Sequence, residues 1–206
     1  MTGSGLVVRA AQGADRRQAI EVLGRAFQVE PVYHWVFPDP GVRARKLAPL
    51  LGTFVRHLHA GTRTTEVATV AGTVVGAAVW DRPGAVHPGP LRTMRALPGL
   101  LRACGRGLPR LGKLGEKFDE ARPDRPHWYL FHLGADPERQ GNGVGSALLR
   151  AGLARCDREG MPAYLECKPS HLSYYARFGF EAHGEIVVDE ALSSRTMWRE
   201  PTASAT

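Results

Sequence analysis

Apolar residues recur along this chain with two periods, every second residue in some segments and every third or fourth in others. The first period is typical of β-strands, and the second is typical of helices that bury one face. Proline and glycine mark where one segment stops, as at Pro31, Gly72 and Gly179. The pattern therefore predicts strands and helices mixed along the whole chain.

The first half is expected to hold a strand at 6–10, a helix at about 15–30, a packed loop or short helix at 32–40, a helix at 42–60 and a β-hairpin of 64–70 with 73–80. The second half is expected to hold two or three short helices within 82–126, strands at 128–133 and 163–167, a helix from 146, a short helix at 172–178, and strands at 180–182, 184–189 and 195–198. Since no repeat or linker interrupts this order, we expect a single domain over residues 1–206, with a helical insertion at about 82–126.

The most informative stretch is the turn after the strand at 128–133. Asp136-Pro137 ends that strand, and the turn itself reads Gln140-Gly141-Asn142-Gly143-Val144-Gly145 before a helix that starts at Ser146. Glycines at alternate positions let the backbone approach a ligand, and the N–H groups at a helix start attract negative charge. The pattern predicts a phosphate or pyrophosphate cradle, and a plain flexible turn is the alternative. Neither the P-loop nor the Gly-x-Gly-x-x-Gly fingerprint is matched.

Composition and cysteine usage narrow the class of protein. A hydrophobic fraction of 43% and a charged fraction of 23% are ordinary for a globular protein. No apolar run approaches the roughly 18 residues that a membrane span needs, and the N-terminus does not resemble a secretory signal, so we expect a cytoplasmic protein. The scattered Cys104, Cys156 and Cys167 predict no zinc site and no disulfide framework.

The insertion is strongly basic. The net charge of +7 permits nucleic-acid binding, but it equally suits a cofactor with several phosphates. A membrane-surface or nucleic-acid helix is one interpretation of residues 82–126, and an amphipathic cover with a solvated basic face is the other. Because Pro98 and Pro109 would divide a continuous interfacial helix, we favour the cover and expect neither a membrane nor a nucleic-acid partner.

Three stretches together resemble the GNAT acyltransferase superfamily, and in particular its puromycin N-acetyltransferase branch. They are Leu133 to Asp136 with the glycine turn, Met161 to Glu166, and Leu172 to Phe180, which contains Tyr-x-Arg-x-Gly-Phe. The resemblance implies an α/β (α+β) fold with a mixed, mostly antiparallel sheet. The sheet would splay between its fourth and fifth strands and would carry helices on both faces.

The resemblance also implies acetyl-CoA as the cosubstrate. Main-chain N–H groups of the turn would hold the pyrophosphate, and the pantetheine arm would pair with the splayed strand. We interpret Gly134 in that strand as a residue that eases a bulge. The residues implied to bind the cofactor are Leu133, Ala135, Gln140, Gly141, Asn142, Gly143, Val144, Gly145, Ser146 and His171.

Two residues are implied to carry the chemistry. Glu166 at the end of the fifth strand would act as general base, directly or through water, and Tyr175 would protonate the departing thiolate. The main-chain N–H of Ala135 or a neighbour would polarise the thioester carbonyl. The alternatives are that Glu166 is a solvated surface residue and that Tyr175 is a core aromatic.

The aromatic segment after the first helix is implied to wall the acceptor site. Glu30, Tyr33 and His34 are candidates for contacting substrate, whereas His132 is expected to be a satisfied structural histidine. His171 stands where the branch commonly has Asn; either it would replace the hydrogen bond of that Asn, or the site would be altered.

These observations predict an enzyme that moves an acetyl group from acetyl-CoA to a primary amine of a small molecule, by direct attack in a ternary complex. A non-catalytic acyl-CoA-binding module and a protein-amine acetyltransferase remain alternatives. We expect a monomer or a homodimer with no metal. The sequence does not name the amine.

Overall fold

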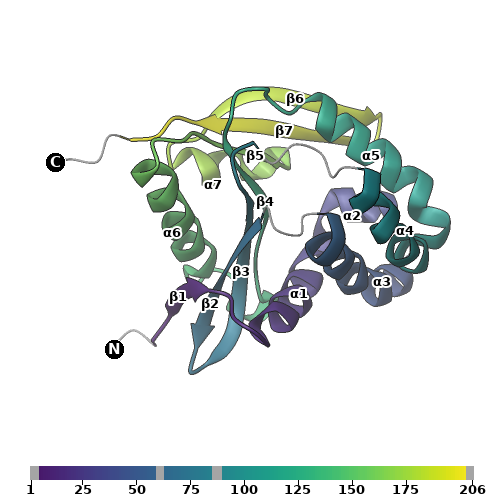
Figure 1. The fold of residues 1–206 in the computed structure, drawn as a ribbon, viewed down its shortest axis with the longest axis horizontal. Helices are drawn as coiled ribbons and strands as arrows, with labels where there is room; N and C mark the ends of the chain where they lie inside the picture. Colours follow the sequence, from purple (N-terminus) through teal and green to yellow (C-terminus); the bar gives the residue numbers. More distant parts are fainter. Residues whose placement is uncertain (1–4, 59–62, 85–89, 203–206) are drawn as a thin grey trace.

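A computed structural model describes residues 5–58, 63–84 and 90–202, and its core is a seven-stranded sheet (Figure 1). Across the sheet the order is β1-β2-β3-β4-β5-β7-β6. Every neighbouring pair is antiparallel except β4 with β5. The strands are β1 Val7–Ala10, β2 Arg63–Val70, β3 Thr73–Asp81, β4 Trp128–Ala135, β5 Ala163–Cys167, β6 Glu181–Asp189 and β7 Leu192–Arg199. The predicted fold class, mixed and mostly antiparallel, is confirmed.

Helices cover both faces of the sheet, with α6 and α7 on one side and α1 to α5 on the other (Figure 1). They are α1 Asp15–Ala26, α2 Pro31–Val36, α3 Pro40–Thr53, α4 Pro90–Cys104, α5 Leu108–Glu120, α6 Val144–Arg158 and α7 Leu172–Ala176. Single turns lie at Phe27–Val29, Phe54–Leu58, Gly105–Gly107, Pro137–Arg139 and Pro169–His171. Each face has its own cluster of buried apolar side chains, one against α1 and α3 and one against α6.

Local sequence accounts for the hairpin that starts the sheet. Ala71 and Gly72 both have positive φ, 49° and 80°, as the two central residues of a type I′ turn require. On the face of the sheet that α6 covers, Gly152 lets α6 approach β3, because a Cβ at this position would lie 2.5 Å from the indole ring of Trp80. The turn thus joins β2 to β3 locally, whereas Gly152 permits a packing contact between distant segments, α6 and β3.

The sheet splays between β4 and β5, as expected. The two strands pair only at Trp128 with Ala163 and at Tyr129 with Tyr164, and beyond these pairs they separate. On its other side β4 stays paired with β3 as far as Ala135. One edge of β4 is therefore open where a ligand can pair with it.

The interpretation of Gly134 was wrong. The register between β3 and β4 shifts at Phe131, since Val79 faces His132 and Trp80 faces Leu130. Gly134 is needed for packing instead, because a Cβ there would lie 3.0 Å from side-chain atoms of Leu23 and Ala26 in α1. This glycine lets a helix cross β4 closely.

The insertion forms two helices, α4 and α5, although its residues 85–89 lie outside the described chain. The expectation that Pro98 divides a helix was wrong, because α4 continues through it. An internal proline removes one backbone hydrogen bond, and here the freed carbonyl belongs to Met94, whose side chain is 70% exposed, so water can replace the bond. Pro109 sits in the first turn of α5, where its missing N–H costs nothing.

Smaller differences concern where helices and strands begin and end. Helix α6 begins at Val144 rather than 146, and the two strands expected at 180–182 and 184–189 form one strand, β6, with an irregular register near His183. The last two residues of the helix expected at 42–60 lie outside the described chain. None of the described helices is long and apolar enough to cross a membrane.

Candidate active site

A cavity of about 1010 Å³ opens where β4 and β5 separate. Its lining comes from both sides of the splay and from the insertion. Of the residues predicted for the site, the cavity brings together Glu30, Tyr33, Leu133, Ala135, Gln140, Gly141, Gly143, Val144, Gly145, Ser146, Glu166, His171 and Tyr175. Asn142 and His34 do not line it.

One end of the cavity is the glycine turn and the start of α6. Gly141 and Gly143 both have φ of 79°, a left-handed conformation that side-chain-bearing residues resist, and no atom lies within 4 Å of the position a Cβ would take in either. They are glycines because of their backbone conformation. Gly143 is the N-cap of the 15-residue helix α6, so the free N–H groups of its first turn point outward at this end.

Side chains complete this cradle. The hydroxyl of Tyr174 lies 3.4 Å from Ser146 Oγ and 3.2 Å from where a Cβ of Gly145 would be. Arg139 and Arg177 also line the cavity and supply positive charge. Tyr174 and Arg139 were not among the predicted site residues, and Arg177 was quoted only as part of the Tyr-x-Arg-x-Gly-Phe motif. A helix N-terminus, left-handed glycines and two cations suit a pyrophosphate.

The open edge of β4 leads from the cradle into the cavity. The N–H of Asp136 donates to the Val75 carbonyl of β3 at 2.9 Å. Because successive N–H groups of a strand point to opposite sides, the N–H of Ala135 faces the splay. The residues therefore fit a cofactor with an extended, amide-bearing arm and a pyrophosphate at one end.

Tyr175 lies in α7 beside this edge. Its side chain is 8% exposed, and its ring packs edge-on against Tyr174 and Phe180, with ring centres 5.0 Å and 5.9 Å away. Burial raises the pKa of its hydroxyl well above the ordinary value, so it keeps its proton at neutral pH. Cys167 lines the cavity close by, and burial raises its pKa to about 12, which leaves it a protonated thiol.

Glu166 lies at the end of β5, on the opposite wall of the splay. Burial raises the pKa of its carboxyl to about 7, against the opposing effects of the Tyr129 hydroxyl, the Arg122 guanidinium and the Tyr164 hydroxyl. Its Oε1 is buried with no hydrogen-bond partner. A carboxyl poised near neutrality with one free oxygen is suited to take a proton from a ligand.

Arg122 follows α5 and brings the insertion to this carboxyl. Its guanidinium lies 4.5 Å from the centre of the Tyr129 ring and 3.3 Å from Asp119 Oδ1. Its charge favours the ionised form of Glu166. The sequence carried no motif for Arg122, because only the fold brings the end of the insertion next to β4 and β5.

Of the three candidates in the segment expected to wall the acceptor site, Glu30 and Tyr33 line the cavity. Tyr33 is 7% exposed, and its hydroxyl lies 2.6 Å from Nε2 of the buried His132. Glu30, just before α2, forms an ion pair with Lys168, just after β5, at 2.9 Å. His34 is exposed, with Nε2 2.8 Å from the Gln28 carbonyl oxygen, and it points elsewhere.

Burial lowers the pKa of His171, which keeps its ring neutral near pH 7.

The far end of the cavity is lined mainly by the insertion and is rich in aromatic residues and acids. Phe118, Glu116 and Asp119 come from α5, and Phe54 and Phe131 also line the cavity. Among the described residues no three His, Cys, Asp or Glu are placed to hold a metal ion. This end therefore combines apolar surface with acidic groups.

Comparisons with known proteins agree with this geometry. A model of the acetyltransferase (GNAT) family matches residues 29–180. A crystal structure described as histone acetyltransferase HPA2 and related acetyltransferase, from Corynebacterium glutamicum, superposes with a TM-score of 0.76 at 28% identity over 98% of this chain and 99% of that one.

More distant structures share the fold and carry the cofactor. A GNAT family acetyltransferase from Brucella melitensis in complex with acetyl-CoA has a TM-score of 0.52 at 18% identity, with 98% of this chain and 93% of that one covered. An uncharacterised N-acetyltransferase of Schizosaccharomyces pombe is 33% identical over 82 residues. That match covers 38% of this chain and 33% of the length of the relative.

Proposed function

The chain belongs to the acetyltransferase (GNAT) family, and on this premise we propose that it transfers the acetyl group of acetyl-CoA to a primary amine of a small molecule. The observation that carries the proposal is the single cavity in which the cradle, Glu166 and Tyr175 meet. Bound acetyl-CoA supplies an activated thioester. All other steps depend on groups of this chain.

The backbone would hold and orient the cosubstrate. The N–H groups at the start of α6 and the arginines at 139 and 177 are suited to the pyrophosphate, and the open edge of β4 is suited to the amide-bearing arm. The N–H of Ala135 would then donate to the thioester oxygen as negative charge develops on it. This arrangement leads the thioester to the mouth between β4 and β5.

Glu166 would take the proton of the ammonium group, because only a neutral amine attacks a thioester. The nitrogen then forms a bond to the acetyl carbon, the carbon–sulfur bond breaks, and the nitrogen would release its second surplus proton to solvent to give the neutral amide. Tyr175 would give its proton to the departing sulfur, and the proton held by Glu166 would restore the phenol through solvent. Amine and thioester would meet in one cavity, which supports direct attack in a ternary complex.

The acceptor end supports a small amine rather than a protein chain. Helix α5 of the insertion lines it, and aromatic side chains lie there with acids at positions 116, 119 and 166 and the cation Arg122. Such a wall favours an apolar body with a protonated amine and leaves little room for a polypeptide. A kinship with the puromycin N-acetyltransferase branch is supported by Tyr175-x-Arg177-x-Gly179-Phe180.

The test is an acceptor screen that follows CoA thiol release by purified protein with acetyl-CoA. We expect release with apolar primary amines and not with their N-methylated quaternary analogues, which have no proton to lose and no lone pair. Turnover of peptide amines alone would favour a protein acetyltransferase. Tight acetyl-CoA binding without release for any amine would favour a binding module and overturn the proposal.

A further inference from the structure

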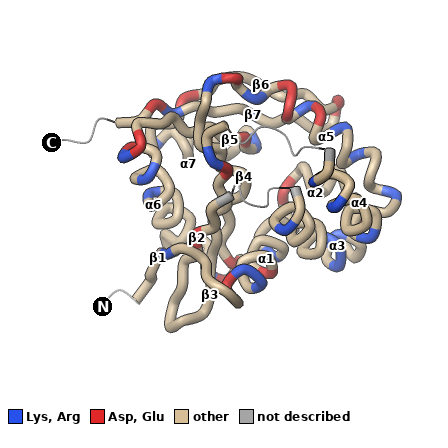
Figure 2. Tube along the Cα trace, in the orientation of Figure 1, with Lys and Arg blue, Asp and Glu red and all other residues tan. Residues whose placement is uncertain are grey.

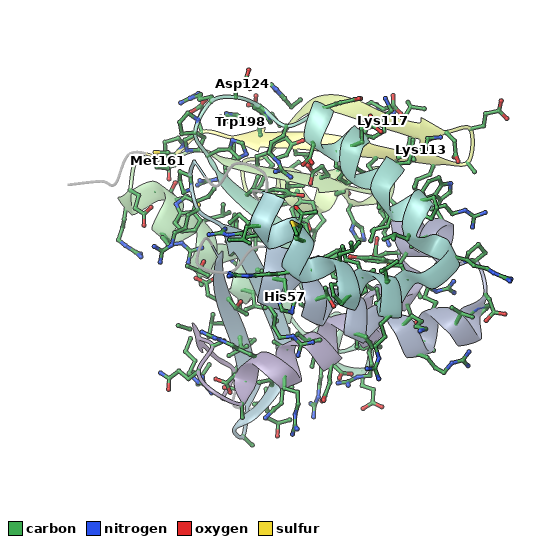
Figure 3. All side chains as sticks on the ribbon, turned by 45° about the vertical axis from the view of Figure 1, so that its right-hand side comes forward. His57, Lys113, Lys117, Asp124, Met161 and Trp198 are labelled. Atoms are coloured by element: carbon green, nitrogen blue, oxygen red, sulfur yellow. The ribbon has the colours of Figure 1, made fainter. Side chains whose placement is uncertain are left out.

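Helix α4 presents a row of large apolar side chains to solvent. Leu91, Met94, Leu97 and Leu101 are 59%, 70%, 45% and 52% exposed. Their spacing of three and four residues places them on one side of the helix. The inner side is formed by Ala96, Leu100 and Ala103, which pack into the core. Figure 3 shows α4 and α5 turned toward the viewer, in front of the sheet. We call the four exposed residues the α4 stripe.

The α4 stripe lies in a segment with one sign of charge. From residue 90 to residue 115 there are six cations and no Asp or Glu, and the cations are Arg92, Arg95, Arg102, Arg106, Arg110 and Lys113. Figure 2 shows Lys and Arg positions along α4 and none of the opposite charge there. Within the described parts of the chain, Arg95, Arg102 and Arg106 form no ion pair. The stripe is thus bordered by uncompensated positive charge.

An exposed apolar stripe bordered by arginines favours one kind of partner. A second copy of this chain docked stripe to stripe would bring arginines against arginines. A nucleic acid would satisfy the arginines through its phosphates, but it would leave the leucines and Met94 in water. An anionic lipid surface takes both, since its headgroups attract arginine and its acyl region receives apolar side chains. We propose that the α4 stripe and its arginines dock this protein peripherally on anionic membranes.

The fold removes the sequence argument against such a surface. That argument relied on prolines dividing the helix, but α4 runs unbroken from Pro90 to Cys104 and carries Pro98 on its exposed side. Both the core-facing side of this helix and its solvent-facing stripe are apolar. Docking would bury the stripe without moving the sheet or the cavity lining.

The test measures sedimentation of the full chain with phosphatidylcholine vesicles that contain phosphatidylglycerol, at low and high salt. We expect binding to the mixed vesicles, weak binding to pure phosphatidylcholine, and a loss of binding in high salt. Met94→Ser/Leu101→Ser and Arg95→Glu/Arg102→Glu should each lower the bound fraction about tenfold or more. Acetyl-CoA affinity, measured in parallel, reports whether each variant is folded.

Matched controls separate the site from general charge and apolarity. Val7→Ser/Val187→Ser removes two exposed apolar side chains elsewhere, and Arg16→Glu/Arg17→Glu reverses two exposed charges on α1, so both should bind vesicles as the parent does. Absence of vesicle binding by the parent overturns the proposal, as does equal loss in the controls. Binding to duplex DNA without vesicle binding, or a dimer that only the Met94→Ser/Leu101→Ser variant dissociates, would also overturn it.

Discussion

The two ends of the cavity are built in different ways. The proposed cofactor end consists mainly of backbone groups from one contiguous run, β4 through the start of α6, whereas the proposed acceptor end consists of side chains from residues 27–30, α2, α5, β4 and β5. Backbone groups are the same in every residue, so the first end depends on conformation. The second end depends on which side chains the fold brings together. Substitutions at the cofactor end should therefore weaken acetyl-CoA binding, and those at the acceptor end should lower turnover.

The largest effect is expected from removal of the proposed base. Glu166→Gln keeps the shape of the side chain but cannot take a proton, so kcat should fall by about 10²–10⁴-fold. Acetyl-CoA affinity, measured by calorimetry, should change little because Glu166 lies at the acceptor end. Undiminished turnover would remove Glu166 from the base role.

Gly143→Asp should damage the opposite end. It adds negative charge at the cradle and strains a left-handed residue, so acetyl-CoA affinity should fall by about 10²-fold or more. Gly160→Asp is the matched control, because Gly160 also has positive φ, 62°, but closes the other end of α6. If both variants bind acetyl-CoA equally well, the cradle lies elsewhere.

Tyr175→Phe separates protonation of the thiolate from binding. The ring stays in its aromatic packing, so acetyl-CoA affinity should persist while kcat falls by about 10-fold to 10²-fold. Tyr174→Phe is expected to weaken acetyl-CoA binding instead, since its hydroxyl lies at the cradle. If Tyr175→Phe weakened acetyl-CoA binding and Tyr174→Phe lowered kcat instead, Tyr174 would be the acid and Tyr175 the cradle residue.

The pH profile should report the carboxyl of Glu166. With a pKa of about 7 in the free protein, the base form is present above this pH, and kcat/KM should fall as the pH drops through it. Arg122 favours the ionised form, so Arg122→Gln should raise the pKa and move this acidic limb to higher pH. Arg125→Gln, at an exposed ion pair with Glu200, should leave the limb in place.

The smallest effect is on stability. Tyr33→Phe removes the buried hydrogen bond to His132, which should lower the free energy of unfolding by about 1 kcal/mol in urea titration. His34→Ala, on the adjacent exposed residue, should change it by less than about 0.5 kcal/mol. Equal losses would mean that α2 is held by its helix contacts rather than by this bond.

The order of strands and helices could be predicted because each element carries its own local signal. Turn glycines at 72, 141 and 143 have the positive φ that their positions require, and apolar periodicity placed most elements within a few residues. Gly134 and Pro98 were misinterpreted for a shared reason. A glycine that admits a crossing helix and a proline on the exposed side of a helix look the same in sequence as a bulge and a break.

The sequence by itself determined the cofactor end, because a run of neighbouring residues fixes both the strand–turn–helix path and the backbone groups that it exposes. Only the tertiary structure decided the acceptor end. It placed Arg122 beside Glu166, paired Glu30 with Lys168, joined Tyr33 to His132 and turned the α4 stripe to solvent. Each of these depends on segments far apart in the chain, whose approach is set by packing on the splayed sheet rather than by any local pattern.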